Sequence, residues 1–283
     1  MRPVIEKNRF GVRHIIYIIM IVICVVAIGI GVYMQFFKDE KLGIIFGITK
    51  ETEDQELKTL QENFFNIFTN DIEIVNDYSG NVQKIKEDGD LVILATNTQE
   101  QQEKYTMDLK IPYFNIKEDN AINLNQKIKN IFKDKSESVA NSTSDVNVIY
   151  NVKYKAYLNN NILSLAILSE FKEGDNNQRI IVLTYNYNLD TNREVSINDI
   201  ISNKNIDIKQ ANQHIKNTVD NSQKENLKLR DLGYPIDVRD SNSEEYKIEN
   251  AKQFFQGQNG YLYVLYPYGN KEFTSEMDIV IIR

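Results

Sequence analysis

Histidine and cysteine, the side chains that most often carry nucleophilic or acid–base chemistry, are almost absent from this 283-residue chain. Its one cysteine is Cys24, and its two histidines are His14 and His214. Ser-His-Asp and Cys-His arrangements need a histidine beside the nucleophile, and a zinc site needs several nitrogen or sulfur ligands. His214 falls on the polar edge of an expected helix, where a solvated surface histidine is the usual case. The sequence therefore predicts no triad, no metal site and no cofactor.

Carboxylates are numerous, and a pair of them can hydrolyse a glycosidic bond without any other catalytic group. Asp237, Asp240, Glu244 and Glu245 are examples, but they belong to a polar connection in which charged side chains are usually solvated, and their spacing selects no pair. The triplet at residues 88–90, Asp-Gly-Asp, lacks the further ligands of a calcium loop. No glycine-rich phosphate loop is found either. We therefore expect a protein that is not an enzyme.

Tyrosine is the residue type whose distribution indicates a binding function. A tyrosine ring offers a flat apolar face and a polar tip, which suit sugar stacking or the anchoring of a protein partner. A proline cannot donate to a sheet ladder, so the last expected hairpin should end or turn outward at Pro267, with Tyr266 and Tyr268 at its rim. The predicted ligand-binding residues are Tyr263, Tyr266, Pro267, Tyr268 and Phe273. The alternative is that the tyrosines merely alternate between the two faces of a strand.

The elements that would position these residues follow from hydrophobic periodicity and turn chemistry. Helices are expected over about 18 residues from Thr52, around Ile122–Phe132 with Ile122, Leu124, Ile128, Ile131 and Phe132 as its core stripe, and around Ile208–Val219. Short strands at residues 72–75, 82–85 and 91–95 would form a small meander, and residues 105–113 alternate as a strand. A three-stranded meander is expected at residues 146–158, 162–171 and 180–189, and a final hairpin at residues 261–268 and 277–282. The expected fold class is α+β, with an antiparallel sheet covered by helices.

The first forty residues predict a membrane anchor. Residues 15–37 contain no charged side chain, and at 1.5 Å per residue a helix of this length spans roughly 34 Å, enough to cross a bilayer. The preceding segment carries a net charge of +3, so the positive-inside bias places the N-terminus in the cytoplasm and the C-terminal domain outside the cell. A cleaved signal peptide would need a shorter apolar core and a small-residue cleavage site, and neither is found.

Charge and small-residue spacing bear on partners. The chain carries −7 and its first 37 residues carry +3, which leaves −10 on the remainder. An acidic domain fits nucleic acid poorly and a basic partner better, although net charge also simply maintains solubility. In the expected span, Ala27 and Gly31 stand four residues apart, a spacing that lets two helices approach closely, so these residues are the candidate contact of a weak homodimer.

Two stretches resemble a paired domain of unknown function from Firmicutes. The first runs from Met107-Asp108-Leu109-Lys110-Ile111-Pro112-Tyr113-Phe114 through the three-stranded meander to residues 195–200, and the second joins Phe254-Phe255 to residues 260–268 and the closing strand at 278–282. The pair occurs in the exterior part of lysozyme-responsive anti-sigma-V factors and in the N-terminal accessory region of peptidoglycan deacetylases. The resemblance covers about residues 104–283 and implies binding of cell-wall glycan or of a basic protein such as lysozyme. Only 14 residues precede the span, so sigma-factor sequestration is not expected.

The sequence thus predicts five segments: a cytoplasmic N-terminus at 1–14, a transmembrane helix at 15–37, a juxtamembrane helix with a small β meander at 38–103, and α+β subdomains at 104–203 and 204–283. The expected function is a membrane-anchored extracellular binding or sensing module at the cell wall, without catalysis of its own. The alternative is an enzyme, or an enzyme accessory, that acts on peptidoglycan or another wall glycan.

Overall fold

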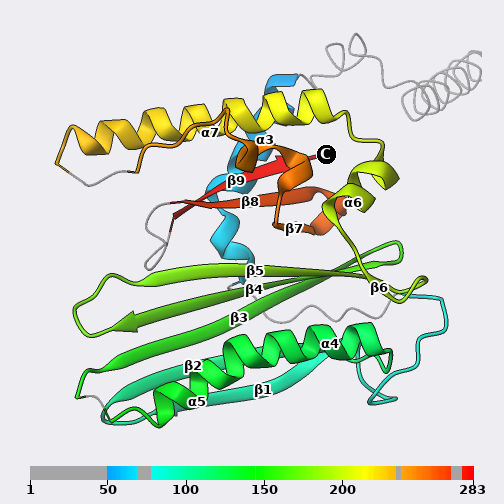
Figure 1. Ribbon diagram of the computed structural model, residues 1–283, viewed down its shortest axis with the longest axis vertical. Helices are drawn as coiled ribbons and strands as arrows, with labels where there is room; N and C mark the ends of the chain where they lie inside the picture. The colour runs from blue at the N-terminus through cyan, green and yellow to red at the C-terminus, as the bar shows by residue number, and fades with distance from the viewer. Residues whose placement is uncertain (1–49, 69–77, 144, 234–236, 269–275) are drawn as a thin grey trace, which may run out of the picture. The chain divides into compact units, whose positions relative to one another are not determined.

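The computed structural model describes residues 50–68, 78–143, 145–233, 237–268 and 276–283 (Figure 1). Side chains are described in these ranges except those of residues 50–54 and 259. The expected membrane span at residues 15–37, with Ala27 and Gly31, lies outside these ranges. None of the helices within them has the length and apolar content needed to cross a bilayer. Residues from Leu60 to Arg283 form one compact unit, and both sheets belong to it.

The first sheet has six strands in the order β1-β2-β3-β4-β5-β6. The strands are β1 (Val92–Gln101), β2 (Tyr105–Phe114), β3 (Val148–Asn159), β4 (Ile162–Glu173), β5 (Arg179–Asn188) and β6 (Arg193–Glu194). The expected three-stranded meander is confirmed as β3, β4 and β5, and its turns contain Asn160 and Gly174 with φ of 56° and 52°. These left-handed conformations are why the links are rich in asparagine and glycine.

An antiparallel sheet was expected, but β2 and β3 pair in parallel. Between them lie α4 (Asp119–Ile128), the π-helical turn η2 (Lys129–Lys133) and α5 (Asp134–Ala140). A helical connection of this length carries the chain back to the end of the sheet at which β2 began, and the next strand then runs in the same direction as β2. The fold class remains α+β, with an antiparallel-rich sheet and helices.

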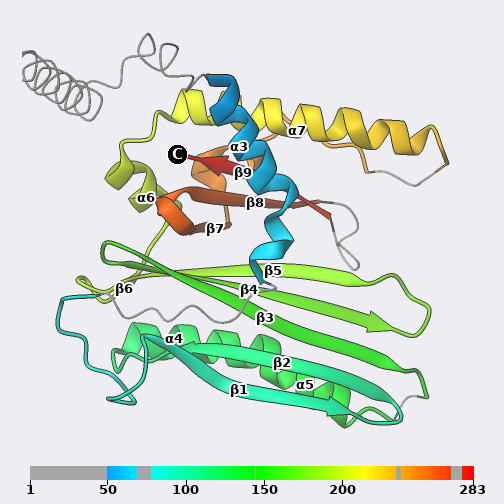
Figure 2. The same cartoon turned by 180° about the vertical axis from the view of Figure 1, so that it is seen from behind.

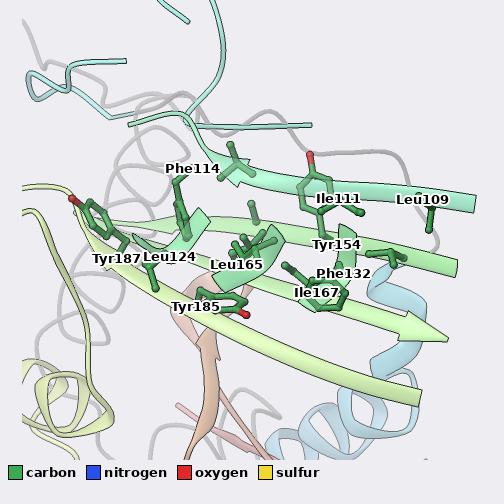
Figure 3. Close-up of a cluster of buried hydrophobic side chains, with 14 of the residues drawn as sticks. Leu109, Ile111, Phe114, Leu124, Phe132, Tyr154, Leu165, Ile167, Tyr185 and Tyr187 are labelled. Atoms are coloured by element: carbon green, nitrogen blue, oxygen red, sulfur yellow. The ribbon is translucent and has the colours of Figure 1, made fainter. Parts of the chain in front are cut away.

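One hydrophobic core fills the space between this sheet and α4–α5 (Figure 3). Phe114, Leu165, Ile167 and Tyr187 point from the strands toward Leu124 and Phe132 of the helical segment. Two members of the expected core stripe, Ile122 and Ile131, lie on the surface instead, where they are 46% and 45% exposed. The buried positions Leu124, Ile128 and Phe132 recur every four residues, and this row faces the sheet together with Ala121.

The second sheet, in the order β7-β8-β9, has a separate hydrophobic core with the helices α6 and α7. Its strands are β7 (Gln253–Gln256), β8 (Leu262–Tyr268) and β9 (Glu276–Ile282), and the helices are α6 (Ile197–Lys204) and α7 (Ile208–Arg230). Short 3-10 turns stand at η3 (Glu244–Tyr246), η4 (Ile248–Asn250) and η5 (Gln258–Gly260).

α6 begins with a capping box between Ser196 and Asp199. The final hairpin is confirmed as β8 and β9. Figures 1 and 2 show this sheet and α4–α5 on opposite sides of the first sheet.

The N-terminal part of the described chain differs most from the expectation. The helix α3 (Lys50–Glu62) is shorter than predicted, and it is followed by the tighter 3-10 turn η1 (Phe64–Phe68). Residues 82–85 form no strand, and residues 91–95 are the start of the longer strand β1. The predicted strand at 72–75 lies outside the described residues. The expected boundaries at 103/104 and 203/204 fall in the β1–β2 turn and within α6, so β1 belongs to the same sheet as β2.

The outer edge of β7 is joined to the first sheet by side chains rather than by another strand. The backbone N–H of Phe254 donates to Thr184 Oγ1 at 2.9 Å, and its carbonyl accepts from Asn186 Nδ2 at 2.7 Å. The N–H of Gln256 donates to Ser164 Oγ at 3.1 Å, and this hydroxyl donates to Asn186 Oδ1 at 2.7 Å. Polar side chains of β4 and β5 thus replace the missing neighbour of β7.

Replacing Asn186 with alanine should lower the free energy of unfolding by about 2 to 4 kcal/mol, because the Phe254 carbonyl would be left buried without a donor and the Ser164 hydroxyl without an acceptor for its proton. Chemical denaturation followed by tyrosine fluorescence measures the change. Asn151→Ala is the matched control. Asn151 is half-buried on the same face of the sheet, and its side chain makes no hydrogen bond with the described residues. Its replacement should cost no more than about 0.5 kcal/mol. Equal losses in the two variants would contradict this assignment.

Candidate functional site

Tyr263 of the predicted site lies in the interior. It is buried, and its ring stacks on Phe255 with a centroid separation of 4.7 Å and an interplanar angle of 11°. Phe64 of η1 packs against both rings at 6.2–6.3 Å. A Cβ at position 257 would approach this tyrosine ring to 2.5 Å, so the residue there must be Gly257. Tyr263 therefore packs the interface of β7, β8 and η1, and it presents no face to a ligand.

Tyr266 is also buried, on the opposite face of β8 from Tyr263 by the strand alternation. Its ring packs against Tyr246 with centroids 5.1 Å apart. Burial raises the pKa of the Tyr266 hydroxyl. That hydroxyl makes no hydrogen bond within the described part of the chain. Tyr266 thus belongs to the second core and not to the rim of the sheet.

Pro267 and Tyr268 are the two predicted residues that the structure brings to the surface. Pro267 is exposed and Tyr268 is half-buried. The strand does not end at the proline as expected, because β8 continues to Tyr268, which pairs with Glu276 of β9. The proline is tolerated because β7 pairs only with residues 262–265, so β8 has one neighbour at Pro267. Phe273, the remaining predicted residue, lies outside the described residues.

The ring of Tyr268 is fixed by two contacts that the sequence analysis missed. The guanidinium of Arg239 lies over the ring, with its central carbon 4.0 Å from the centroid. The side-chain amide of Asn226, in α7, donates to the Tyr268 hydroxyl at 3.0 Å. Stacking on a buried cation and a bond to the hydroxyl restrict both ends of the ring. Tyr268 is therefore held in one orientation before any ligand arrives.

Arg239 is itself held by a buried ion pair with Asp278 of β9. Arg239 Nε lies 2.8 Å from Asp278 Oδ2, and the two side chains are 3% and 1% exposed. A terminal nitrogen of Arg239 also donates to Asp278 Oδ1 at 3.2 Å and to Ser222 Oγ at 2.9 Å. The Tyr246 hydroxyl donates to Asp278 Oδ2 at 3.2 Å. Burial raises the pKa of Asp278, and the guanidinium opposes that rise by favouring the carboxylate.

This ion pair supports the tyrosine and has no access to a substrate. The sequence did contain one signal for it, since Asp278 is a charge inside the apolar strand Met-Asp-Ile-Val-Ile-Ile. A charge in such a strand needs a buried partner. Its partner could not be identified from the sequence, because Arg239 lies in an irregular connection 39 positions earlier.

Two of the carboxylates weighed for catalysis, and the histidine, make structural contacts within the domain. Asp240 accepts from the backbone N–H of Asn242 at 3.0 Å, and Glu244 pairs with Lys247. His214 Nε2 lies 3.2 Å from the carbonyl oxygen of Ile281, at the outer edge of β9, so it is a half-buried packing residue rather than a solvated one. Within the described ranges, no three His, Cys, Asp or Glu side chains are grouped as metal ligands would be.

A polar groove of about 440 Å³ lies between α4 and β6, and its residues are distant in sequence from the final hairpin. It is lined by Asn120, Asn123, Leu124, Gln126, Lys127, Asn130 and Glu194. Lys127 and Glu194 form an ion pair at 3.2 Å across it. Because an amide side chain both donates and accepts hydrogen bonds, this lining is able to bind hydroxyl groups. The sequence analysis did not find this groove, since its residues are ordinary polar positions on a helix surface.

Asp278→Ala should destabilise the protein by about 3 to 5 kcal/mol, because Arg239 would remain buried without its counter-charge. The double variant Arg239→Met, Asp278→Leu should recover most of that loss, since it removes both charges and keeps apolar volume. Chemical denaturation of the three proteins gives the comparison. A double variant less stable than Asp278→Ala would contradict this prediction, because the loss in Asp278→Ala would then not come from the uncompensated charge of Arg239.

Comparisons with known proteins assign no family to this chain. No family model matches the chain, and no curated protein matches it. Solved structures that resemble it include a DUF3298 family protein from Pseudomonas aeruginosa PAO1, which is 9% identical, with 68% of this chain and 86% of the other covered and a TM-score of 0.37. Another is a DUF3298 member from Bacteroides fragilis NCTC 9343, 13% identical, with 63% and 80% covered and a TM-score of 0.33. At these values the likeness assigns neither a family nor a function to the chain.

Proposed function

We propose that this chain is a non-catalytic binding or sensing module, anchored in the cell membrane by residues 15–37 and facing the cell wall. The anchor is supported by the uncharged apolar run and the positive flank before it. The binding role is supported by the surface around Pro267 and Tyr268. The membrane orientation thus rests on the sequence, and the ligand surface at Pro267 and Tyr268 rests on the fold.

The fixed orientation of Tyr268 is the observation that carries the binding role. An aromatic side chain held in place before binding loses little conformational entropy when a partner covers it. The stack on Arg239 and the bond from Asn226 provide that constraint, and Pro267 beside it is rigid and exposed. A surface made of rigid groups is a suitable anchor for a protein partner.

Charge favours a basic protein as the ligand. Residues 38–283 carry −10, which would attract a basic partner and increase its rate of association. Hen egg-white lysozyme is a suitable probe, because it is a basic protein that acts at the cell wall. In this proposal the acidic domain steers the partner and Tyr268 anchors it.

A glycan ligand is the second candidate, and the groove on α4 favours it. Its amide lining, formed by residues such as Asn123 and Asn130, can donate to and accept from sugar hydroxyls. In that case the protein would hold wall glycan, alone or as an accessory to an enzyme, through a surface that does not include Tyr268. Soluble peptidoglycan fragments are the probe for this alternative.

Tyr268→Ala should weaken lysozyme binding by about 1 to 3 kcal/mol, or about 5- to 150-fold in Kd, because the anchor ring is removed. Titration calorimetry on the full chain in detergent measures the affinity, and thermal unfolding is recorded on the same sample. Tyr261→Ala is the matched control, since Tyr261 is also half-buried beside an arginine, Arg283, but lies at the start of the final hairpin. It should leave the affinity unchanged.

Three results would contradict the protein-ligand proposal. The first is no binding of lysozyme by the unaltered chain, the second is equal loss in both variants, and the third is a large fall in melting temperature for Tyr268→Ala without a specific loss of affinity. Binding of peptidoglycan fragments that is lost on Asn123→Ala and retained on Tyr268→Ala would instead support the glycan candidate.

A further inference from the structure

Strand β1 presents an edge with unpaired backbone groups. At the β1–β2 turn the N–H of Gln102 donates to the carbonyl of Tyr105 at 2.8 Å, which makes these two residues a hydrogen-bonded pair. In an antiparallel ladder such pairs alternate with non-bonded ones. The register therefore directs the N–H and C=O groups of alternate β1 residues away from β2. These residues are Asn97, Gln99 and Gln101.

Parts of the edges of three other strands, β7, β9 and β5, are covered by side chains of the described residues. The outer edge of β7 bonds to side chains of the first sheet, and the outer edge of β9 accepts bonds at Ile279, from Gln61 Nε2 at 2.8 Å, and contacts His214 at Ile281. On β5, the N–H of Thr184 donates to Gln253 Oε1 at 2.7 Å. For residues 96–101 of β1, no contact of this kind is found among the described residues.

The open stretch of β1 also lacks the usual protection against strand pairing. Natural edge strands are commonly interrupted by proline, lysine or a bulge. Between Thr96 and Gln101 there is no proline or lysine, and the bulge in this strand lies before it, between Leu94 and Thr96. The side chains of Asn97, Gln99 and Gln101 are exposed, so a neighbouring strand could approach without moving other parts of the chain.

We propose that β1 pairs antiparallel with β1 of a second copy of this chain, about a two-fold axis at Gln99. This register places Asn97 opposite the partner's Gln101 and Glu100 opposite the partner's Thr98. All the outward backbone groups from Asn97 to Gln101 then find a partner, giving on the order of six backbone hydrogen bonds. An axis at Glu100 would set two carboxylates against each other, and an axis at Thr98 would extend the pairing into the bulge.

The chemistry of the strand favours an identical strand as its partner. An amide side chain donates and accepts hydrogen bonds, so a row of asparagine and glutamine is complementary to its own copy. The one charged residue of the stretch, Glu100, does not face its equivalent in this register. The contact is isologous, so it closes at two copies and leaves no further β1 edge exposed. The β1–β1 contact does not involve the proposed ligand surface, which lies on β8. In the expected span, the Ala27–Gly31 spacing would give the two copies a second contact.

Site-directed disulfide formation in membrane vesicles tests the register. Full-length chains carrying Cys24→Ser have no other thiol, and Gln99→Cys or Gln101→Cys is added to this background. The two copies of residue 99 would have Cα atoms about 5.5 Å apart, within disulfide range. The two copies of residue 101 would be roughly 14 Å apart. Mild oxidation should therefore give a dimer with Gln99→Cys at least about tenfold faster than with Gln101→Cys.

A proline variant tests whether the pairing is the cause of association. Gln99→Pro removes an N–H that points away from β2, so the β1–β2 ladder should remain and the melting temperature should be unchanged. Thr98→Pro is the matched control, because Thr98 bonds to β2, and it should lower the melting temperature. The full chain is prepared with Gly31→Leu, which removes the small-residue spacing of the expected span. Sedimentation in detergent should then show dimers when β1 is unaltered and monomers when Gln99→Pro is added. Equal cross-linking at positions 99 and 101, no cross-linking at either, or dimers that persist in Gln99→Pro would overturn the proposal.

Discussion

The backbone of β7 needs hydrogen-bond partners on both sides, and only one side has a neighbouring strand. An unpaired N–H or C=O buried between two sheets costs about 1 to 3 kcal/mol, so a sheet that places an edge against another layer must satisfy that edge in some way. Here Ser164, Thr184 and Asn186 take the place of a strand. Each of these three small polar residues points from the first sheet toward the second. Their bonds fix the position of β7 and, through its ladder, that of β8 and β9.

The same constraint explains how the proposed ligand surface is held. β8 is the central strand of the second sheet, and it carries Tyr263 at one end and Tyr268 at the other. Tyr263 is packed against Phe255 and Phe64, while Tyr268 rests on Arg239, whose charge is balanced by Asp278. A strand that is fixed at its inner end and supported at its outer end presents Tyr268 in one orientation. Rigidity at the surface therefore derives from polar contacts in the interior.

The sequence predicted the parts of the fold that depend on local chemistry. The asparagine- and glycine-rich links at Asn160 and Gly174 predicted two turns of the first sheet, and the alternation of residues 261–266 predicted a strand of the final hairpin. It did not predict the parallel pairing of β2 with β3, since that depends on where a helical connection returns the chain. Of the predicted site residues, Tyr263 and Tyr266 are buried, because strand alternation places tyrosines on both faces and only tertiary packing decides which face is covered. Arg239 was missed because its partner, Asp278, is distant in sequence, so only tertiary packing brings the two together.

Amide hydrogen exchange tests most directly whether the side-chain bonds to β7 join the two sheets into one cooperative unit. Four amides are informative: those of Phe254 and Gln256, which donate to side chains of the first sheet, and those of Leu165 in β4 and Val264 in β8, which report on the two cores. The account predicts that all four exchange with the same free energy of opening, equal to that of global unfolding. Exchange of Phe254, Gln256 and Val264 at a free energy lower than that of Leu165 by about 2 kcal/mol or more would contradict it, because the second sheet would then open by itself.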